Sequence, residues 1–234
     1  MVLSIQYPEL KPLRHDAFVY FNAVQPGHYK IAVTYKGKTP EYNEPKEKFA
    51  AEFTKNDTIT SGNWGGIFGK EGYVLCNYNG DGTDKKSLPS YVSSIEYFRA
   101  FGGSNQVPDN TTWKLGTNDK RAAAPDSSNQ TLRNATCISN PDQTMTVTIG
   151  INGTKDYQVA LYFVDWENKG SRVAIEMFDA NSLNLIAPVK IVNNYSGGKY
   201  LVYSYNKSAK FRVNNVRGGF VTLSGIFFDK KLQL

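Results

Sequence analysis

The sequence predicts an all-β protein, built as an antiparallel β-sandwich of the jelly-roll kind. Aromatic residues make up 13% of the chain, including 15 Tyr, and Val, Ile and Thr occur in runs, which is typical of strands. Short alternating or apolar segments follow one another about every ten residues, with turn residues between them. No helical period extends beyond about two turns. A chain of 234 residues can also bury a core without needing a metal or a disulfide.

A glycine-rich aromatic stretch from Asp57 to Tyr73 organises the predicted domain. It holds five glycines between residues 62 and 73, together with Trp64 and Phe68. Glycine is used where the backbone needs a positive φ or passes close to another group, and the rings between glycines offer flat faces. Residues 73–76 then read as a strand. We therefore expect this stretch to form a tight aromatic entrance to a β domain.

The strands expected after this stretch follow from their side-chain patterns. Gln143–Ile149 alternates polar and apolar residues, which predicts a strand with one buried face. Asp156–Asp165 is mostly apolar, which predicts a central strand buried on both faces. Residues 179–182 predict a turn, and residues 77–89 a polar loop. The other expected strands are Tyr91–Phe101, Thr111–Leu115, a small one at Arg121–Ala124, Leu132–Ser139, Arg172–Phe178, Leu185–Val192, Lys199–Tyr205, Lys210–Val213 and Phe220–Phe228.

We assign residues 1–50 to an N-terminal tether and hairpin, and residues 51–234 to the sandwich. After a polar tether, the strands Ala17–Phe21 and His28–Tyr35 flank a Pro-Gly turn, which predicts a hairpin. A charged linker follows, with a short helix expected around Glu44–Phe53. An isolated hairpin is marginal in water, so this one must pack on something. It is either the remnant of a preceding β domain or a source of edge strands for the sandwich.

Charge and cysteine usage narrow the classes of partner. The net charge is +6, but no run of Lys or Arg exceeds two residues, which favours solvated surfaces over a nucleic-acid interface. A zinc site is disfavoured because there is no Cys-x-x-Cys and the only histidines are His15 and His28. Cys76 and Cys137 either pair or are buried apolar residues.

No stretch approaches the roughly 18 apolar residues of a membrane helix. The first residues lack the apolar region of a signal peptide, so we expect a fragment of a longer secreted protein.

Two acidic groups are candidates for chemistry. Asp165 and Glu167 flank Trp166 at a strand end, where residues two apart share a face, as the carboxylate pair of a glycosidase would. The alternative is a solvated strand exit that leads into a turn. Asp81 and Asp84 suggest a small calcium site, although an EF-hand is excluded because its twelfth position is Leu88; an ordinary Asx-rich turn is the alternative. Sequence signatures of Ser-His-Asp hydrolases, zinc proteases and P-loops are absent, and the sandwich lacks a credible general base.

Aromatic residues near loop ends are the remaining signal. Trp64, Trp113 and Trp166 are predicted as platforms on which a sugar ring stacks, since sugars present CH faces to aromatic rings. Their alternative role is packing in the core. The predicted polar partners of the sugar hydroxyls are Asn63, Asp165, Glu167 and Arg172.

Five segments of the chain, in their order along the sequence, resemble those of a known family of β-sandwich modules. They are Thr60–Tyr73, Leu88–Val92, Gln158–Trp166, Gly198–Tyr203 and Leu223–Phe228. Together, over about residues 57–229, they resemble a β-sandwich module appended to large secreted bacterial carbohydrate-active enzymes, among them rhamnosidase-like glycoside hydrolases. The resemblance implies a galactose-binding-like fold and does not specify a ligand. The insertion at residues 80–86 and the two cysteines depart from the module.

We therefore expect a non-catalytic carbohydrate-binding or accessory module of an extracellular polysaccharide-degrading enzyme. Its expected partners are a carbohydrate, bound with micromolar to millimolar affinity, and the other domains of the parent enzyme. We expect no nucleic acid, no membrane span and no cofactor beyond a structural calcium ion. The protein should be a monomer, located outside the cell, in the periplasm or on the cell surface. The alternatives are a spacer or docking domain without a ligand, and a fragment of a glycoside hydrolase that uses Asp165 and Glu167.

Overall fold

The computed structural model describes residues 2–4, 30–32, 49–99, 107–129, 131–141 and 144–231. Contacts divide the chain into two units, Met1–Glu47 and Lys48–Leu234. In the first unit, β1 (Val2–Ser4) pairs with β2 (Lys30–Ala32) in parallel. Residues 2–4, expected in a tether, therefore form a strand. The predicted strand Ala17–Phe21 and the turn after it lie outside the described residues.

The second unit is an antiparallel β-sandwich, as the sequence predicts, and its described residues contain no helix. Every neighbouring pair of strands in its three sheets runs antiparallel. The six-stranded sheet runs in the order β3 (Glu52–Asp57), β13 (Lys199–Tyr205), β10 (Tyr157–Phe163), β16 (Gly225–Lys230), β4 (Gly72–Leu75), β5 (Lys85–Ser87). The five-stranded sheet runs β12 (Lys190–Val192), β11 (Arg172–Asp179), β14 (Ala209–Arg217), β9 (Thr144–Ile151), β6 (Val92–Phe98). The three-stranded sheet runs β15 (Val221–Leu223), β8 (Arg133–Asn140), β7 (Asp109–Thr117).

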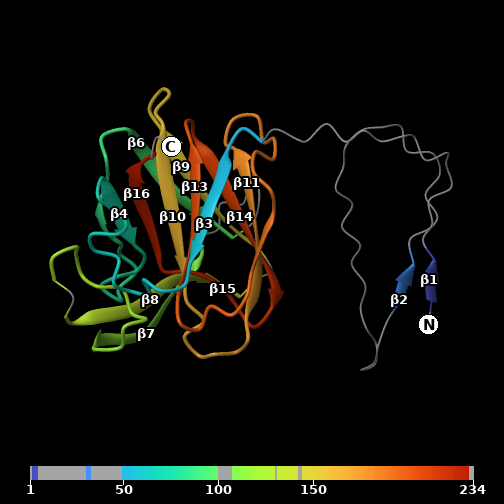
Figure 1. Ribbon diagram of the computed structural model, residues 1–234. Helices are drawn as coiled ribbons and strands as arrows, with labels where there is room; N and C mark the ends of the chain where they lie inside the picture. Colours follow the sequence, from blue (N-terminus) through green and yellow to red (C-terminus); the bar gives the residue numbers. More distant parts are fainter. Residues whose placement is uncertain are drawn as a thin grey trace. The chain divides into compact units, whose positions relative to one another are not determined.

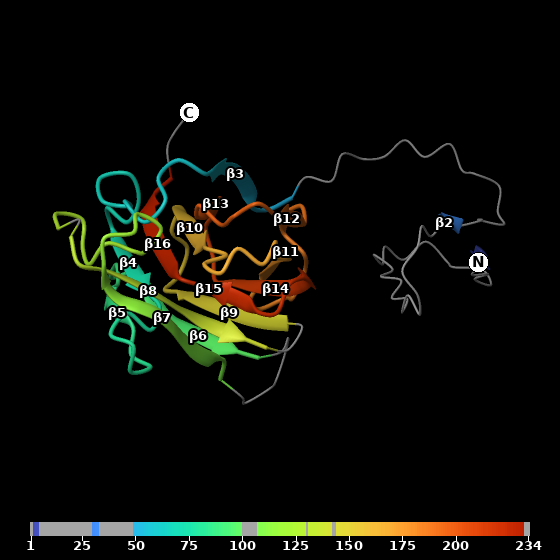
Figure 2. The same ribbon diagram turned by 90° about the horizontal axis from the view of Figure 1, so that it is seen from below.

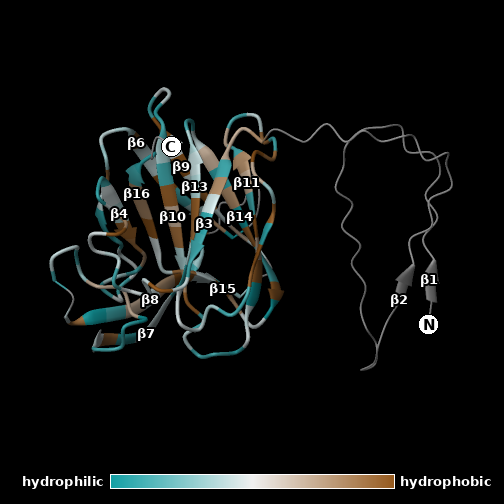
Figure 3. Cartoon of the chain, viewed as in Figure 1, coloured by the Kyte–Doolittle hydropathy of each residue, from teal (hydrophilic) through white to brown (hydrophobic). Residues whose placement is uncertain are grey.

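The two larger sheets form the layers of the sandwich, as the two perpendicular views show (Figures 1 and 2). The three-stranded sheet lies at the lower end of the sandwich in Figure 1. Brown apolar segments run along the central strands in Figure 3, whereas the connecting loops are mostly teal or white. The main core fills the space between the sheets and includes Val159, Leu161 and Phe163 of β10 and Val147 and Ile149 of β9.

The prediction for β10 is confirmed, because β10 lies between β13 and β16 and is buried on both faces. Its odd-numbered apolar residues enter the main core, while Ala160 and Tyr162 enter a second cluster on the other face of the sheet. Burying a large apolar side chain stabilises the fold by about 1.5–3 kcal/mol. Because β10 has two apolar faces, it contributes buried side chains to both clusters.

Several strands of the structure differ in length or position from the strands that the sequence predicts. Leu185–Val192 is a strand only at its end, Lys190–Val192, and Leu185 forms an isolated bridge with Phe178. Phe220–Phe228 divides at Ser224, so that β15 joins the three-stranded sheet and β16 the six-stranded sheet. Arg121–Ala124 contributes a single bridge, from Ala123 to Asn134. The expected polar loop 77–89 contains β5, and Glu52 and Phe53, at the end of the expected short helix, belong to β3.

The glycine-rich aromatic stretch closes the second cluster. The Trp64 side chain is completely buried, its ring centre lies 4.7 Å from that of Tyr73 and 5.2 Å from that of Phe227, and its Nε1 donates to the Ala124 carbonyl at 3.0 Å. A ring without exposed surface offers no face to a sugar. The prediction of Trp64 as a stacking platform is therefore wrong, because tertiary contacts place this loop over an apolar sheet face that needs a large side chain.

The two cysteines are free and buried, so the disulfide alternative is excluded. Burial raises the pKa of both the Cys76 and the Cys137 thiols, because the thiolate loses its hydration. We expect both thiols to be unreactive toward a thiol reagent such as Ellman's reagent in the native protein, and both to react after denaturation without a reductant. Rapid labelling of the folded protein would contradict this burial.

Candidate functional site

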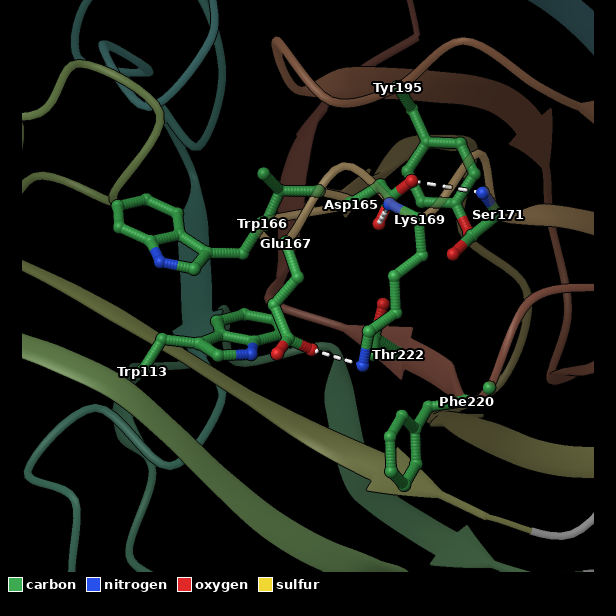
Figure 4. A pocket seen from close by; sticks show the side chains of 11 residues that line it. Trp113, Asp165, Trp166, Glu167, Lys169, Ser171, Tyr195, Phe220 and Thr222 are labelled. Atoms are coloured by element: carbon green, nitrogen blue, oxygen red, sulfur yellow. Dashed lines mark hydrogen bonds and ion pairs between the residues drawn. The ribbon is translucent and has the colours of Figure 1, made fainter.

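The candidate site is a small pocket (Figure 4). It lies beside β7 and β15, at the lower end of the sandwich in Figure 1. Four parts of the chain meet there: β7, which carries Trp113, the turn between β10 and β11, the β12–β13 connection, which carries Tyr195, and the β14–β15 connection, which carries Phe220. The cavity itself is about 20 Å³, which is room for about one water molecule. A larger ligand would therefore lie across its mouth rather than inside it.

Asp165 shapes the turn that presents the pocket residues. Its Oδ1 accepts a hydrogen bond from the Lys169 amide at 3.1 Å, and its Oδ2 accepts one from the Ser171 amide at 2.9 Å. The turn also needs positive φ values, 52° at Asn168 and 66° at Gly170, which Asn and Gly tolerate best. The Asp165 side chain is buried, so both of its oxygens serve the backbone of the turn.

The aromatic part of the site combines residues distant in sequence. The rings of Trp113 and Trp166 lie nearly parallel, at an interplanar angle of 16° and with centres 6.1 Å apart. Both are half-buried and pack against the second cluster. Phe220, on the other side of the pocket, is 41% exposed. The pocket thus has aromatic surface on two sides of its mouth.

Arg121 holds Trp166 in place. Its guanidinium carbon lies 4.3 Å from the Trp166 ring centre, a cation–π contact, and its Nη1 donates to the Trp166 carbonyl at 3.1 Å. Asp119 pairs with the same guanidinium at 2.8 Å, and this hydrogen bonding lowers the pKa of the Asp119 carboxyl. Sequence reasoning missed Arg121, whose only local signal is an acidic partner two residues away.

An ion pair lies at the pocket mouth. Lys169 Nζ is 2.8 Å from Glu167 Oε2, and both side chains are about half exposed, 45% and 49%. The same ammonium lies 5.4 Å from the Phe220 ring centre. Figure 4 shows this pair between the Trp113 indole and the Phe220 ring, with Asp165 turned toward Ser171. Lys169 and Phe220 are site residues that the sequence analysis did not identify.

Four of the predicted binding residues therefore meet at one site, namely Trp113, Asp165, Trp166 and Glu167. The other predicted residues lie elsewhere. Asn63 accepts a hydrogen bond from the buried Arg133, and Arg172 is an exposed residue of β11 that does not line the pocket. Like Trp64, Asn63 has a role in holding the glycine-rich stretch.

The predicted calcium ligand Asp81 serves a local turn, whereas Asp84 joins its loop to β6. Asp81 is exposed and accepts hydrogen bonds from the amide and the hydroxyl of Thr83, and Asp84 accepts from the Asn77 amide and the Tyr97 hydroxyl. Among the described residues, no three or more His, Cys, Asp or Glu side chains are grouped for a metal ion. Calcium binding by Asp81 and Asp84 stays a prediction.

Comparisons with known proteins give limited similarity. No protein-family model matches the sequence, and the search of curated proteins finds no significant match. Among solved structures, an exo-β-1,3-galactanase from Phanerochaete chrysosporium with galactose is 13% identical with a TM-score of 0.29, over 62% of this chain and 30% of that chain. A Clostridium perfringens ZmpB structure, with CBM51-2 in complex with GlcNAc and INT domains, is 11% identical with a TM-score of 0.32, over 77% and 41%.

A third match is the enzymatically active domain of a bacteriophage CBA120 tailspike protein, 15% identical with a TM-score of 0.30, over 61% of this chain and 20% of that chain. Each match therefore covers less than half of the longer chain. At such low TM-scores the matches carry no argument, and the sandwich assignment rests on the strand pairing. No helix in the described part of the chain is long and apolar enough to cross a membrane.

Proposed function

We propose that this protein is a non-catalytic carbohydrate-binding accessory module, and that it binds sugar at the Trp113–Trp166 pocket. One observation carries the proposal: two nearly parallel indole rings lie at the mouth of a pocket beside a half-exposed ion pair. Sugar rings combine CH faces, which pack on aromatic rings, with hydroxyls, which need polar partners. The pocket supplies both kinds of contact within one small area.

The shallow cavity sets the expected affinity. A sugar lying across the mouth would bury only part of its surface, so we expect dissociation constants of about micromolar to millimolar. Arg121 and the Asp165 turn support this use, since they hold Trp166 and Glu167 before any ligand arrives. Preorganised contacts lose less entropy on binding.

The proposal of a non-catalytic role is supported by how the two acidic residues are used. Asp165 bonds to two backbone amides of its own turn, and Glu167 is paired with Lys169. A glycosidase pair instead needs one carboxylic acid to donate a proton and a second carboxylate on the other side of the scissile bond.

We further propose that the module is a monomer, acts outside the cell and is joined to other domains of a polysaccharide-degrading enzyme.

The proposal predicts that Trp166→Ala will weaken glycan binding. The full chain would first be screened on a glycan array, and the best ligand would then be titrated by calorimetry. We expect the Trp166→Ala variant to bind about five- to thirtyfold more weakly, because loss of the stacked ring and of the apolar area it buries costs about 1–2 kcal/mol. The matched control is Trp64→Phe, which changes a buried Trp outside the pocket and should leave the affinity unchanged.

Two results would overturn the proposal. Failure of the full chain to bind any glycan would favour the spacer or docking alternative. Hydrolysis of a polysaccharide by the full chain, abolished by Glu167→Gln with the fold intact, would instead support the glycoside hydrolase alternative.

A further inference from the structure

The net charge of the pocket lining has the opposite sign to the net charge of the whole chain. The chain carries a net charge of +6, yet the charged lining consists of the Asp165 and Glu167 carboxylates and a single ammonium, that of Lys169. Asp119 and Arg121, behind Trp166, compensate each other through their ion pair. The pocket mouth is therefore locally negative, which disfavours an anionic ligand.

The position of the Lys169 ammonium shows what this mouth accommodates. The ammonium is 2.8 Å from the Glu167 carboxylate and 5.4 Å from the centre of the Phe220 ring. A carboxylate combined with an aromatic face is the environment that stabilises an alkylammonium ion. The chain thus places one of its own primary ammonium groups at the same mouth where the sugar is proposed to lie.

This internal ammonium can be exchanged at little cost. Both partners of the pair are about half exposed, and exposed ion pairs contribute only about 0–1 kcal/mol. Lys169 has a flexible side chain on an exposed turn, so it can swing into solvent without changing the backbone. Glu167 and Phe220 would then be available to a second ammonium group.

We propose that the pocket selects saccharides that carry protonated amines, with the sugar amine replacing the Lys169 ammonium between Glu167 and Phe220. The proposal rests on the proposed function, because it assigns a substrate class to the same site. Trp113 and Trp166 contact the CH face of the sugar, and Glu167 pairs with its ammonium. Polymers of unacetylated amino sugars fit this chemistry, whereas acetylation removes the charge and a uronic acid reverses it.

The test compares three oligosaccharides of equal length by calorimetry with the full chain. The probes are hexamers of glucosamine, N-acetylglucosamine and galacturonic acid, at a pH where the glucosamine amine is protonated. We expect the glucosamine hexamer to bind about two- to fivefold more tightly than the N-acetylated one, the range that one exposed ammonium–carboxylate pair allows, and the galacturonate hexamer to bind most weakly.

Three variants separate the role of each charge. Glu167→Gln should reduce the preference for the amine to less than about twofold, because the charge that the ammonium pairs with is lost. Lys169→Met should strengthen binding of the glucosamine hexamer, because the competing internal ammonium is removed. Glu52→Gln makes the same charge change on the exposed edge strand β3, outside the pocket, and should leave the preference as it is. Thermal melting monitored by circular dichroism checks that each variant is folded.

The possible failures are distinguishable. Equal affinity for the acetylated and unacetylated hexamers, or tighter binding of galacturonate that Lys169→Met abolishes, overturns the amine selectivity and leaves the proposed function standing. Absence of binding to these hexamers and to every sugar of the glycan array overturns both.

Discussion

Trp64→Ala is expected to destabilise the sandwich by about 3–5 kcal/mol, the typical range for truncating a fully buried large aromatic residue. The ring is completely buried between Tyr73 and Phe227, so its removal leaves a cavity that these neighbours fill only in part. The variant also leaves the Ala124 carbonyl without its indole donor. Urea unfolding monitored by circular dichroism gives the difference in the free energy of unfolding.

The matched control is Trp113→Ala. Trp113 is half-buried on β7, so its truncation removes less buried surface and should cost clearly less free energy of unfolding than Trp64→Ala. Equal losses for the two variants, or a loss below about 1 kcal/mol for Trp64→Ala, would show that the glycine-rich stretch is not part of the core.

Gly62→Ala is expected to produce a loss of similar size, about 3 kcal/mol or more, although it adds a single methyl group. A Cβ at this position would lie 1.9 Å from the Ala122 carbonyl oxygen and 2.7 Å from that of Lys120. The backbone cannot retreat easily, because the Gly62 amide donates to the Lys120 carbonyl at 2.7 Å and the Gly62 carbonyl accepts from the Ala124 amide at 3.0 Å. Relief of the clash must therefore break at least one of these hydrogen bonds.

Gly197→Ala is the matched control for this substitution. A Cβ at Gly197 meets no atom within 4 Å, and its φ is not in the left-handed region. We expect the free energy of unfolding to change by no more than about 1 kcal/mol, in the stabilising direction if the unfolded chain loses entropy. The comparison uses thermal melting of both variants; a Gly62→Ala variant that melts with the wild type would refute the close approach seen here.

The local pattern of the sequence was enough to predict the fold class and most strands. The alternation in Gln143–Ile149 corresponds to β9, and the two-faced apolar run at 156–165 corresponds to the central strand β10. Such patterns are readable because side chains alternate between faces with a period of two. Turns could also be predicted from local sequence, because Asp, Asn and Gly favour turn conformations wherever they occur together.

The site was predicted only in part. The strand end at Asp165 and the neighbouring Trp166 and Glu167 were found because they are adjacent in sequence. Phe220 was not found, because the pocket brings it to Trp166 from a separate loop and nothing near it in sequence marks this position. Trp64 was assigned to the wrong environment for the same reason, since burial depends on which distant residues cover a ring.

The sequence by itself thus determined the sandwich, the succession of its strands and the turn after β10, because hydrophobic period and turn chemistry are local properties. Only the tertiary structure decided which tryptophans are buried, how Phe220 and Arg121 join the pocket, and that Cys76 and Cys137 stay unpaired. These outcomes depend on contacts between residues far apart in the chain, where packing of whole sheets sets the distances.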